Sequence, residues 1–178
     1  DSALEKIPDV SKYGSTKDEQ YFNVALELTL TWINRILFLK LLESQLFNYN
    51  KNEAYKFLNS KTIKDYDELY KLFHQVLAVK LKDRTRDVNK KFNLVPYLNS
   101  SLFEITDLEN ITLKINSLDD GASIDLYAST VLKENGGRKK TGQLITLHYL
   151  FEFLEAYNFT SEGKEEIEDE KKTLINAS

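Results

Sequence analysis

Two groups of basic residues are the side chains best suited to contact a polyanion. One group follows a predicted helix, and the other lies in a loop bounded by Gly136, Gly137 and Gly142. Lys and Arg bind phosphate oxygens through charge without reading base sequence, and bare glycine backbone lets a phosphate approach closely. The candidate DNA-backbone contacts are Lys82, Arg84, Arg86, Lys90, Lys91, Arg138, Lys139 and Lys140. The alternative, that both groups are ordinary solvated loops, stays open.

Residues arranged for catalysis or for metal binding are scarce. A metal-dependent nuclease needs acids and a Lys that converge on a divalent ion, and here Asp9 would have to combine with the distant Glu162 or Glu170. We expect these acids to form a solvated surface, with a degenerate nuclease as an alternative. His74 and His148 lack partners at ligand spacing, so we predict partly buried packing residues. The sequence therefore predicts no catalytic, cofactor-binding or metal-binding residues.

Composition narrows the class of protein. With 178 residues and 42% hydrophobic content, the chain can bury a core as a single domain. Its net charge of −4 is not the footprint of a basic nucleic-acid-binding domain, and the absence of Cys excludes disulfides and thiol catalysis. No secretory signal is visible, and charges interrupt the most apolar stretch before it is long enough to cross a bilayer. We therefore expect a cytoplasmic protein with no membrane partner.

One stretch organises the predicted elements. Residues Lys17–Tyr49 contain no Pro or Gly and carry two apolar stripes at helical spacing. Both stripes would be covered by other elements in a bundle: Phe22, Leu26, Leu30, Ile33, Leu37 and Leu41 form the first, and Leu28, Trp32, Ile36, Leu39, Leu42 and Leu46 form the second. Ser15 or Thr16 is the predicted cap. Within this helix, Asn34-Arg35 is a candidate buried polar pair that requires an acidic or carbonyl partner.

The remaining elements are shorter. Residues 1–16 are predicted to form a lead-in arm, and Asn93–Glu104 to pack as irregular or single-turn structure. Alternating residues around an Asp-Asp-Gly turn predict a β-hairpin at about 111–127. Further helices are predicted over Glu53–Leu58, Thr62–Leu81 and Leu144–Tyr157, with a last one starting in Thr173–Ser178. The predicted fold is mainly α: a helical bundle around one long central helix, with a small β-hairpin insertion.

Three stretches resemble a known family of enzymes. They are WINRILFLKLLESQL (Trp32–Leu46), VPYLNSSLFE (Val95–Glu104) and the end of the chain from LITLHYLFEFLEAYNF (Leu144–Phe159) to TLINAS. Together they resemble the region that precedes the methyltransferase core in bifunctional Type IIG restriction–modification enzymes. The most specific piece is Pro96–Glu104, in which Ser100 and Ser101 stand where many members of that family have two glycines.

The resemblance implies that residues 17–178 are a single non-catalytic helical connector domain. Its partners would be the flanking nuclease and adenine-N6 methyltransferase domains, and its end would lead into that methyltransferase, which is absent here. The family's methyl-donor loop and Asn-Pro-Pro-aromatic tetrapeptide are missing from this sequence, so S-adenosylmethionine and Mg would belong to the parent enzyme and no cofactor to this fragment. The alternative from another class is a free-standing α-helical protein-interaction module.

Overall fold

A computed structural model describes residues 3–159 and 172–173 of the chain. The chain divides into two compact units, one formed by Asp1–Phe38 with Asp67–Leu118 and the other by Leu39–Tyr66 with Asp119–Ser178. They are called unit 1 and unit 2 below, and each is described by itself.

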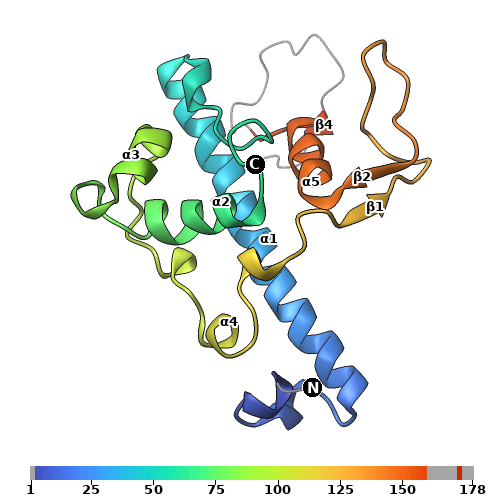
Figure 1. The fold of residues 1–178 in the computed structure, drawn as a ribbon. Coiled ribbons are helices and arrows are strands. Elements are labelled where there is room, and N and C mark those ends of the chain that lie inside the picture. Colours follow the sequence, from blue (N-terminus) through green and yellow to red (C-terminus); the bar gives the residue numbers. More distant parts are fainter. Residues whose placement is uncertain (1–2, 160–171, 174–178) are drawn as a thin grey trace. The chain divides into compact units, whose positions relative to one another are not determined.

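The long helix α1 spans Lys17–Asn50 and is continuous in Figure 1, which confirms the predicted helix over Lys17–Tyr49. Its start is a capping arrangement: the Glu19 amide donates to Thr16 Oγ1, and the Ser15 and Thr16 amides donate to Glu19 Oε2. The hydrogen bonds from the backbone amides lower the pKa of Glu19, and the bond from Ser15 has the largest effect. The helix ends where Lys51 adopts a left-handed conformation with φ of 49°.

Unit 1 combines the first part of α1 with short helical segments, most of them single turns. The chain changes direction often here, as the Pro and Asn residues of Asn93–Glu104 predict. The bounds are Leu4–Lys6 and Val10–Tyr13 in the arm, α2 (Tyr66–Lys71, all but its first residue in unit 1), a π-helical segment Leu72–Leu77, Leu81–Asp83, α3 (Arg86–Phe92), Ser101–Phe103, α4 (Asp107–Ile111) and Ile115–Ser117.

The core of unit 1 covers only one of the two apolar stripes of α1. Leu28, Trp32 and Ile36 are buried, as are Phe73 of the π-helical segment and Phe103 of the turn Ser101–Phe103. The other stripe is exposed, so the expectation that both are covered is wrong for this unit: Phe22, Leu26, Leu30, Ile33 and Leu37 face solvent. The cause is Arg35, which lies on the face of Leu28, Trp32 and Ile36 and whose partners all approach from that side.

Two predicted elements of this region are corrected. The helix expected over Thr62–Leu81 begins at Tyr66, because the Tyr66 amide donates to Asp120 Oδ1 (2.8 Å) and Thr62 takes no part in its start. The hairpin expected at 111–127 does not form, since Ile111 ends α4 and Ile115 starts a single 3-10 turn. The irregular packing of Asn93–Glu104 is confirmed by the turn Ser101–Phe103 and by buried Val95 and Phe103.

Unit 2 contains the small sheet. β1 (Ser123–Asp125) pairs antiparallel with β2 (Gln143–Ile145), so the predicted second strand of the hairpin exists but finds its partner after the loop that carries the second basic group. α5 (Thr146–Glu155) follows β2 directly and buries Leu147, Phe151 and Leu154. A 3-10 turn Glu53–Tyr55 replaces the predicted short helix. β3 (Tyr157–Asn158) pairs in parallel with β4 (Lys172–Thr173).

The mainly α fold with one long helix and a small antiparallel sheet is confirmed. The helix expected over Thr173–Ser178 lies outside the described residues, apart from Thr173 in β4. Within the described part of the chain, no helix has the length and apolar character needed to cross a membrane.

The end of α1 generates a first prediction. Lys51 holds a backbone conformation that costs an L-residue energy and glycine almost none. Lys51→Gly is therefore expected to raise the free energy of unfolding by roughly 0.5–1 kcal/mol, measured by urea denaturation. Lys51→Ala, which keeps the Cβ, serves as the control and should show no gain; an equal gain in both variants would contradict the backbone explanation.

Candidate functional site

The most heavily bonded buried group in unit 1 is the ion pair between Arg35 of α1 and Glu109 of α4. Arg35 is fully buried, and its Nη1 and Nη2 donate to Glu109 Oε1 and Oε2 at 2.6 and 2.9 Å. Trp32 Nε1 donates to the same Oε1 at 2.8 Å. Two parallel bonds between a guanidinium and a carboxylate fix the orientation of both groups, so α4 is held against α1 at one defined position.

Arg35 also holds the loop that precedes α4. Its Nε donates to the carbonyl oxygen of Leu102 and its Nη2 to that of Glu104, both at 2.6 Å. Arg35 thus has both an acidic partner, Glu109, and carbonyl partners. Asn34, by contrast, is exposed. The two carbonyls lie in the segment Pro96–Glu104. Ser100 has an extended backbone with φ of −139°, and its side chain accepts a hydrogen bond from the Leu102 amide at the start of the following turn. A glycine is therefore not required at this position.

Glu109 is placed by a local sequence signal, a capping box at the start of α4. Thr106 and Glu109 form a reciprocal capping box at the start of α4, with the Thr106 amide donating to Glu109 Oε2 at 2.9 Å. Thr-x-x-Glu before an apolar residue is the sequence signature of such a start. Burial alone would raise the pKa of Glu109, but the hydrogen bonds from Arg35, Thr106 and Trp32 lower it to about 2. The carboxylate is therefore ionised at neutral pH.

His74 lies beside this cluster and is half-buried, as expected of a packing residue; His148 is likewise half-buried. The Nδ1 of His74 is 2.7 Å from the carbonyl oxygen of Phe103, which makes Nδ1–H the donor. Burial lowers the pKa of His74, and the nearby Arg35 charge lowers it further, so the ring is neutral at pH 7. Nε2 is buried without a hydrogen-bond partner in the described structure, so it is not exposed to a substrate.

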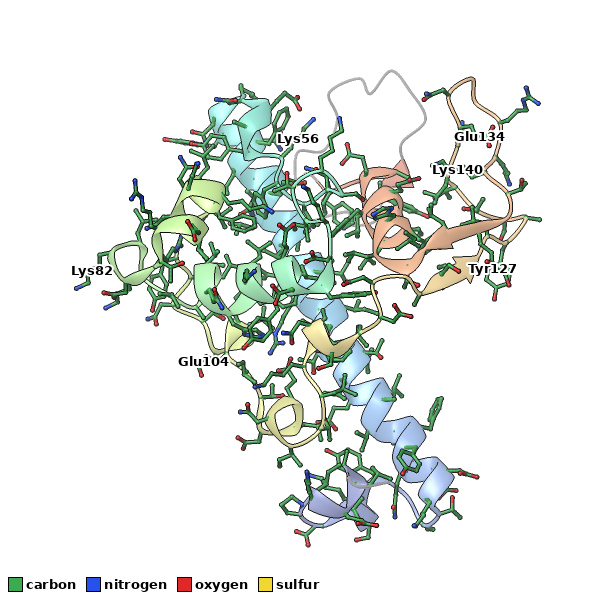
Figure 2. All side chains as sticks on the ribbon, viewed as in Figure 1. Lys56, Lys82, Glu104, Tyr127, Glu134 and Lys140 are labelled. Atoms are coloured by element: carbon green, nitrogen blue, oxygen red, sulfur yellow. The ribbon has the colours of Figure 1, made fainter. Side chains whose placement is uncertain are left out.

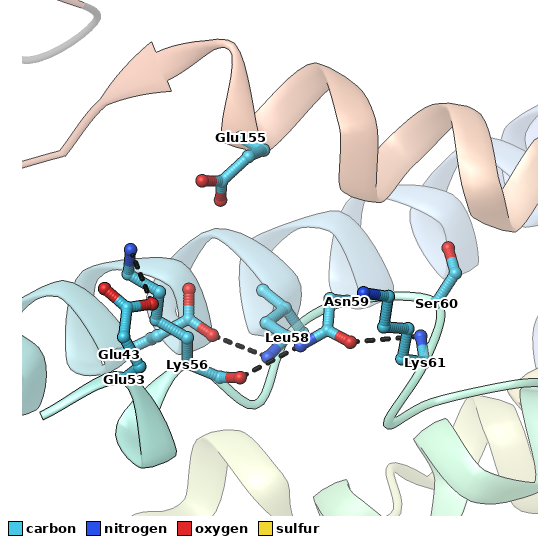
Figure 3. A pocket seen from close by; sticks show the side chains of 8 residues that line it. All are labelled: Glu43, Glu53, Lys56, Leu58, Asn59, Ser60, Lys61 and Glu155. Carbon is cyan, nitrogen blue, oxygen red and sulfur yellow. Dashed lines mark hydrogen bonds and ion pairs between the residues drawn. The ribbon is translucent and has the colours of Figure 1, made fainter.

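Unit 2 contains a second buried ionic group, beside a pocket of about 400 Å³. Lys40 Nζ lies 2.7 Å from Glu43 Oε1 and 3.0 Å from Glu155 Oε2 of α5. Glu43 Oε2 also accepts the amide of Leu58 at 2.5 Å, a bond visible in Figure 3. Burial alone would lower the pKa of Lys40, but the two carboxylates outweigh it and raise the pKa. Lys40 therefore stays charged and is not a nucleophilic amine.

The pocket itself is lined by groups of both signs. Glu53 pairs with Lys56 at 3.0 Å, and Figure 3 shows these two side chains at one end of the pocket, with Ser60 and Lys61 at the other. In the described residues, no three His, Cys, Asp or Glu side chains gather in a way that would hold a metal ion. The acids of the alternative nuclease reading, Glu162 and Glu170, lie outside the described residues.

In the first basic group, which lies in unit 1, some residues are exposed and others bind groups of the protein itself. Lys82, Arg86 and Lys90 are exposed, and Lys82 projects outward in Figure 2. Arg84 is buried instead: its Nε donates to the Val79 carbonyl at 3.1 Å and its Nη1 to the Val95 carbonyl at 2.9 Å. This burial lowers the pKa of the Arg84 guanidinium. Arg84 therefore has a structural role: its hydrogen bonds join the two ends of the loop between the π-helical segment and Val95.

The remaining candidates are mostly paired. Lys91 forms an ion pair with Glu68 in unit 1. In unit 2, Lys140 pairs with Glu152 at 2.6 Å, and Lys139 Nζ donates to the Ala128 carbonyl at 3.0 Å. Arg138 is exposed next to Gly136 and Gly137, whose φ values of 110° and 83° explain the glycines. Of the eight candidate contacts, Lys82, Arg86, Lys90 and Arg138 are therefore the ones that are exposed and for which no hydrogen bond or ion pair is found in the described part of the chain.

The Arg35–Glu109 pair generates a prediction on stability and pH. Glu109→Gln leaves Arg35 buried without its counter-charge and should lower the free energy of unfolding by about 3–5 kcal/mol at pH 7. Because the folded pKa of Glu109 lies below its unfolded value of 4.5, the stability it confers is present above pH 4.5 and is lost as pH falls towards 2.

Urea denaturation at pH 7 and at about pH 3 tests this, with the exposed Glu104→Gln as control. The difference between wild type and Glu109→Gln should shrink at the lower pH, whereas Glu104→Gln should stay close to wild type at both. A loss in Glu109→Gln that is the same at both pH values would count against the ion-pair explanation.

The ionic group of unit 2 generates a matched test. Glu43→Gln removes the buried partner of Lys40 and weakens the bond from the Leu58 amide, so we expect a loss of about 2–4 kcal/mol in the free energy of unfolding. Glu53→Gln changes the same chemistry in the exposed pair with Lys56 and should cost less than about 0.5 kcal/mol. Thermal and urea unfolding of both variants give the comparison; equal effects would mean that the buried network is not structural.

Comparison with known proteins gives a family but no activity. A family model described as a domain of unknown function, DUF7814, matches residues 1–175. No curated protein and no solved structure is similar enough to this chain to count as a match. Since the matching model covers nearly the whole sequence, the chain belongs to the DUF7814 family of domains of unknown function.

Proposed function

We propose that this chain is a non-catalytic helical connector of a DNA restriction–modification enzyme, of the kind that precedes the methyltransferase core in Type IIG enzymes. The observation that carries the proposal is the use of its buried charges. Arg35 and Glu109 hold α4 and the loop Pro96–Glu104 to α1, and in unit 2 Lys40 and Glu43 hold the loop at Leu58 and the end of α5. Buried charges that fix segments far apart in the sequence serve rigidity, which a spacer between catalytic domains requires.

The connector would keep flanking nuclease and methyltransferase domains at a set distance within one cytoplasmic polypeptide. S-adenosylmethionine and Mg would bind the parent enzyme, in the domains that carry its methyl-donor loop and nuclease acids. The resemblance that suggests this parent rests on Pro96–Glu104 more than on any other segment. The clamp from Arg35 fixes the backbone of that segment, because the carbonyl oxygens of Leu102 and Glu104 accept hydrogen bonds from its guanidinium.

The connector would also touch the DNA backbone through the exposed cations of unit 1. Arg86 and Lys90 are four residues apart on α3 and therefore lie on one face of that helix, with Lys82 in the preceding turn. Arg84 is not part of the proposed contact, because its donors bind carbonyl groups. Contacts of this kind position a protein on a duplex without selecting a sequence, so target choice would belong to another part of the enzyme.

A second candidate function, a helical protein-interaction module, is favoured by a different observation. The exposed apolar stripe of α1 (Phe22, Leu26, Leu30, Ile33 and Leu37) is the kind of surface that mediates contacts between proteins. The two functions are not exclusive, because a connector must also contact the domains that it separates.

DNA binding by the exposed cations is tested by the triple variant Lys82→Ala, Arg86→Ala, Lys90→Ala. Fluorescence anisotropy with a short duplex at several salt concentrations should show binding weakened at least about tenfold at low salt. The slope of log affinity against log salt should fall by about 2–3, since three phosphate contacts are removed. The triple variant Lys6→Ala, Lys12→Ala, Lys17→Ala changes net charge equally and should leave the slope near that of wild type.

Two results would overturn the proposal. One is an equal loss of DNA affinity in both triple variants, which would reduce the effect to net charge. The other is tight binding of S-adenosylmethionine to this chain in isothermal titration calorimetry, because a connector has no methyl-donor site.

A further inference from the structure

The apolar stripe of α1 is unusually continuous for a surface that faces water. Phe22, Leu26, Leu30, Ile33 and Leu37 are between 36% and 67% exposed, and all five belong to unit 1. Their steps of three and four residues place them on one side of the helix. Side chains of this size in one row leave more apolar surface in water than scattered exposed residues do, so the row calls for a covering partner.

The surroundings of the stripe lack the charges that keep a helix face solvated. Between Gln20 and Phe38 the sequence holds two charged residues, Glu27 and Arg35. Arg35 is buried on the opposite side with Glu109, so Glu27 is the charged residue on the exposed side of this part of α1. A partner for such a face needs a similarly uncharged apolar surface, because a charged one would lose its hydration without compensation.

The spacing of the stripe is nearly two-fold symmetric along the helix. A midpoint between Thr29 and Leu30 relates Phe22 to Leu37 and Leu26 to Ile33, and leaves Leu30 half a residue from the centre. We propose that α1 pairs antiparallel with α1 of a second copy of this chain, with the two-fold axis at that midpoint. In this isologous contact, each apolar residue of the stripe meets an apolar residue of the second copy.

The charge pattern agrees with self-pairing. In this register Glu27 lies level with Trp32 of the second copy, which is buried on the far side of its own helix. The two copies of Glu27 are therefore not opposite each other, and no like-charge repulsion opposes the contact. The polar residues beside the stripe are Asn23, Thr29 and Asn34, which are uncharged and can remain at the hydrated rim.

The size of the face sets the strength of the dimer. Sixteen residues of helix are about 24 Å long, and a helix pair of that length buries on the order of 1,000 Å² in total, the low end for specific complexes. The dimer is therefore expected to be weak and reversible. This proposal is independent of the connector function, since it rests on the exposed side of α1 alone.

Sedimentation velocity of the 178-residue chain, of monomer mass 20.7 kDa, tests the dimer over about 1–200 µM. Wild type should pass from monomer to dimer across this range. Leu30→Glu should weaken dimerisation at least about tenfold, whereas Leu81→Glu should leave it unchanged. Leu81 is a matched control because it is 53% exposed and Leu30 is 51% exposed. A wild type that stays monomeric, or a dimer that Leu30→Glu leaves intact, would overturn the proposal and leave the stripe to another protein.

Disulfide mapping tests the register without relying on a destabilising variant, and the chain has no Cys of its own to interfere. A mixture of Leu26→Cys and Ile33→Cys proteins should oxidise mainly to the mixed dimer, because these positions meet across the antiparallel axis. Leu30→Cys should link to itself. Efficient self-linking of Leu26→Cys with no mixed product would indicate parallel helices and overturn the antiparallel register.

Discussion

The bidentate pair between Arg35 and Glu109 is the constraint on which unit 1 depends. A charged pair taken out of water loses hydration, and it is tolerated only when nearly every donor and acceptor is satisfied. Here the guanidinium also binds the carbonyls of Leu102 and Glu104, and the carboxylate also receives Trp32 and the Thr106 amide. These bonds join α1, a loop and α4 around one point. The short, irregular segments of unit 1 need such a fixed point, because none of them is long enough to be stable alone.

The same pair decides which side of α1 meets solvent. Because Arg35 must face its partners, Leu28, Trp32 and Ile36 turn inward with it and the stripe from Phe22 to Leu37 turns outward. An exposed apolar stripe is therefore a geometric consequence of a buried ion pair on the same helix. The ion pair makes one side of the helix rigid, as a spacer would require. The apolar surface on the other side is what a docking element would use.

In both units, some basic residues bind other groups of the protein, whereas others are exposed and can contact a ligand. Arg84, Lys91, Lys139 and Lys140 have partners within their own units, so their charges are partly or wholly committed. Lys82, Arg86 and Lys90 are the members of the first basic group that remain exposed without a partner in the described residues, and two of them share one face of α3. A segment rich in basic residues thus contributes fewer available charges than its composition suggests, because carbonyl and carboxylate groups of the same unit bind some of them.

Local sequence signals determined the long helix, a cap at Ser15 or Thr16, and the need of Arg35 for a partner, since these follow from capping preference, from periodicity and from the cost of burying a charge. The Thr106–Glu109 capping box was also readable in the sequence and explains why the expected strand at Ile111 is the end of a helix. Only the tertiary structure decided which stripe of α1 is buried, that Arg84 faces carbonyls, and that β1 pairs with β2 beyond a long loop. Those outcomes depend on partners distant in the sequence, and hydrophobic spacing states that a face is apolar without stating what covers it.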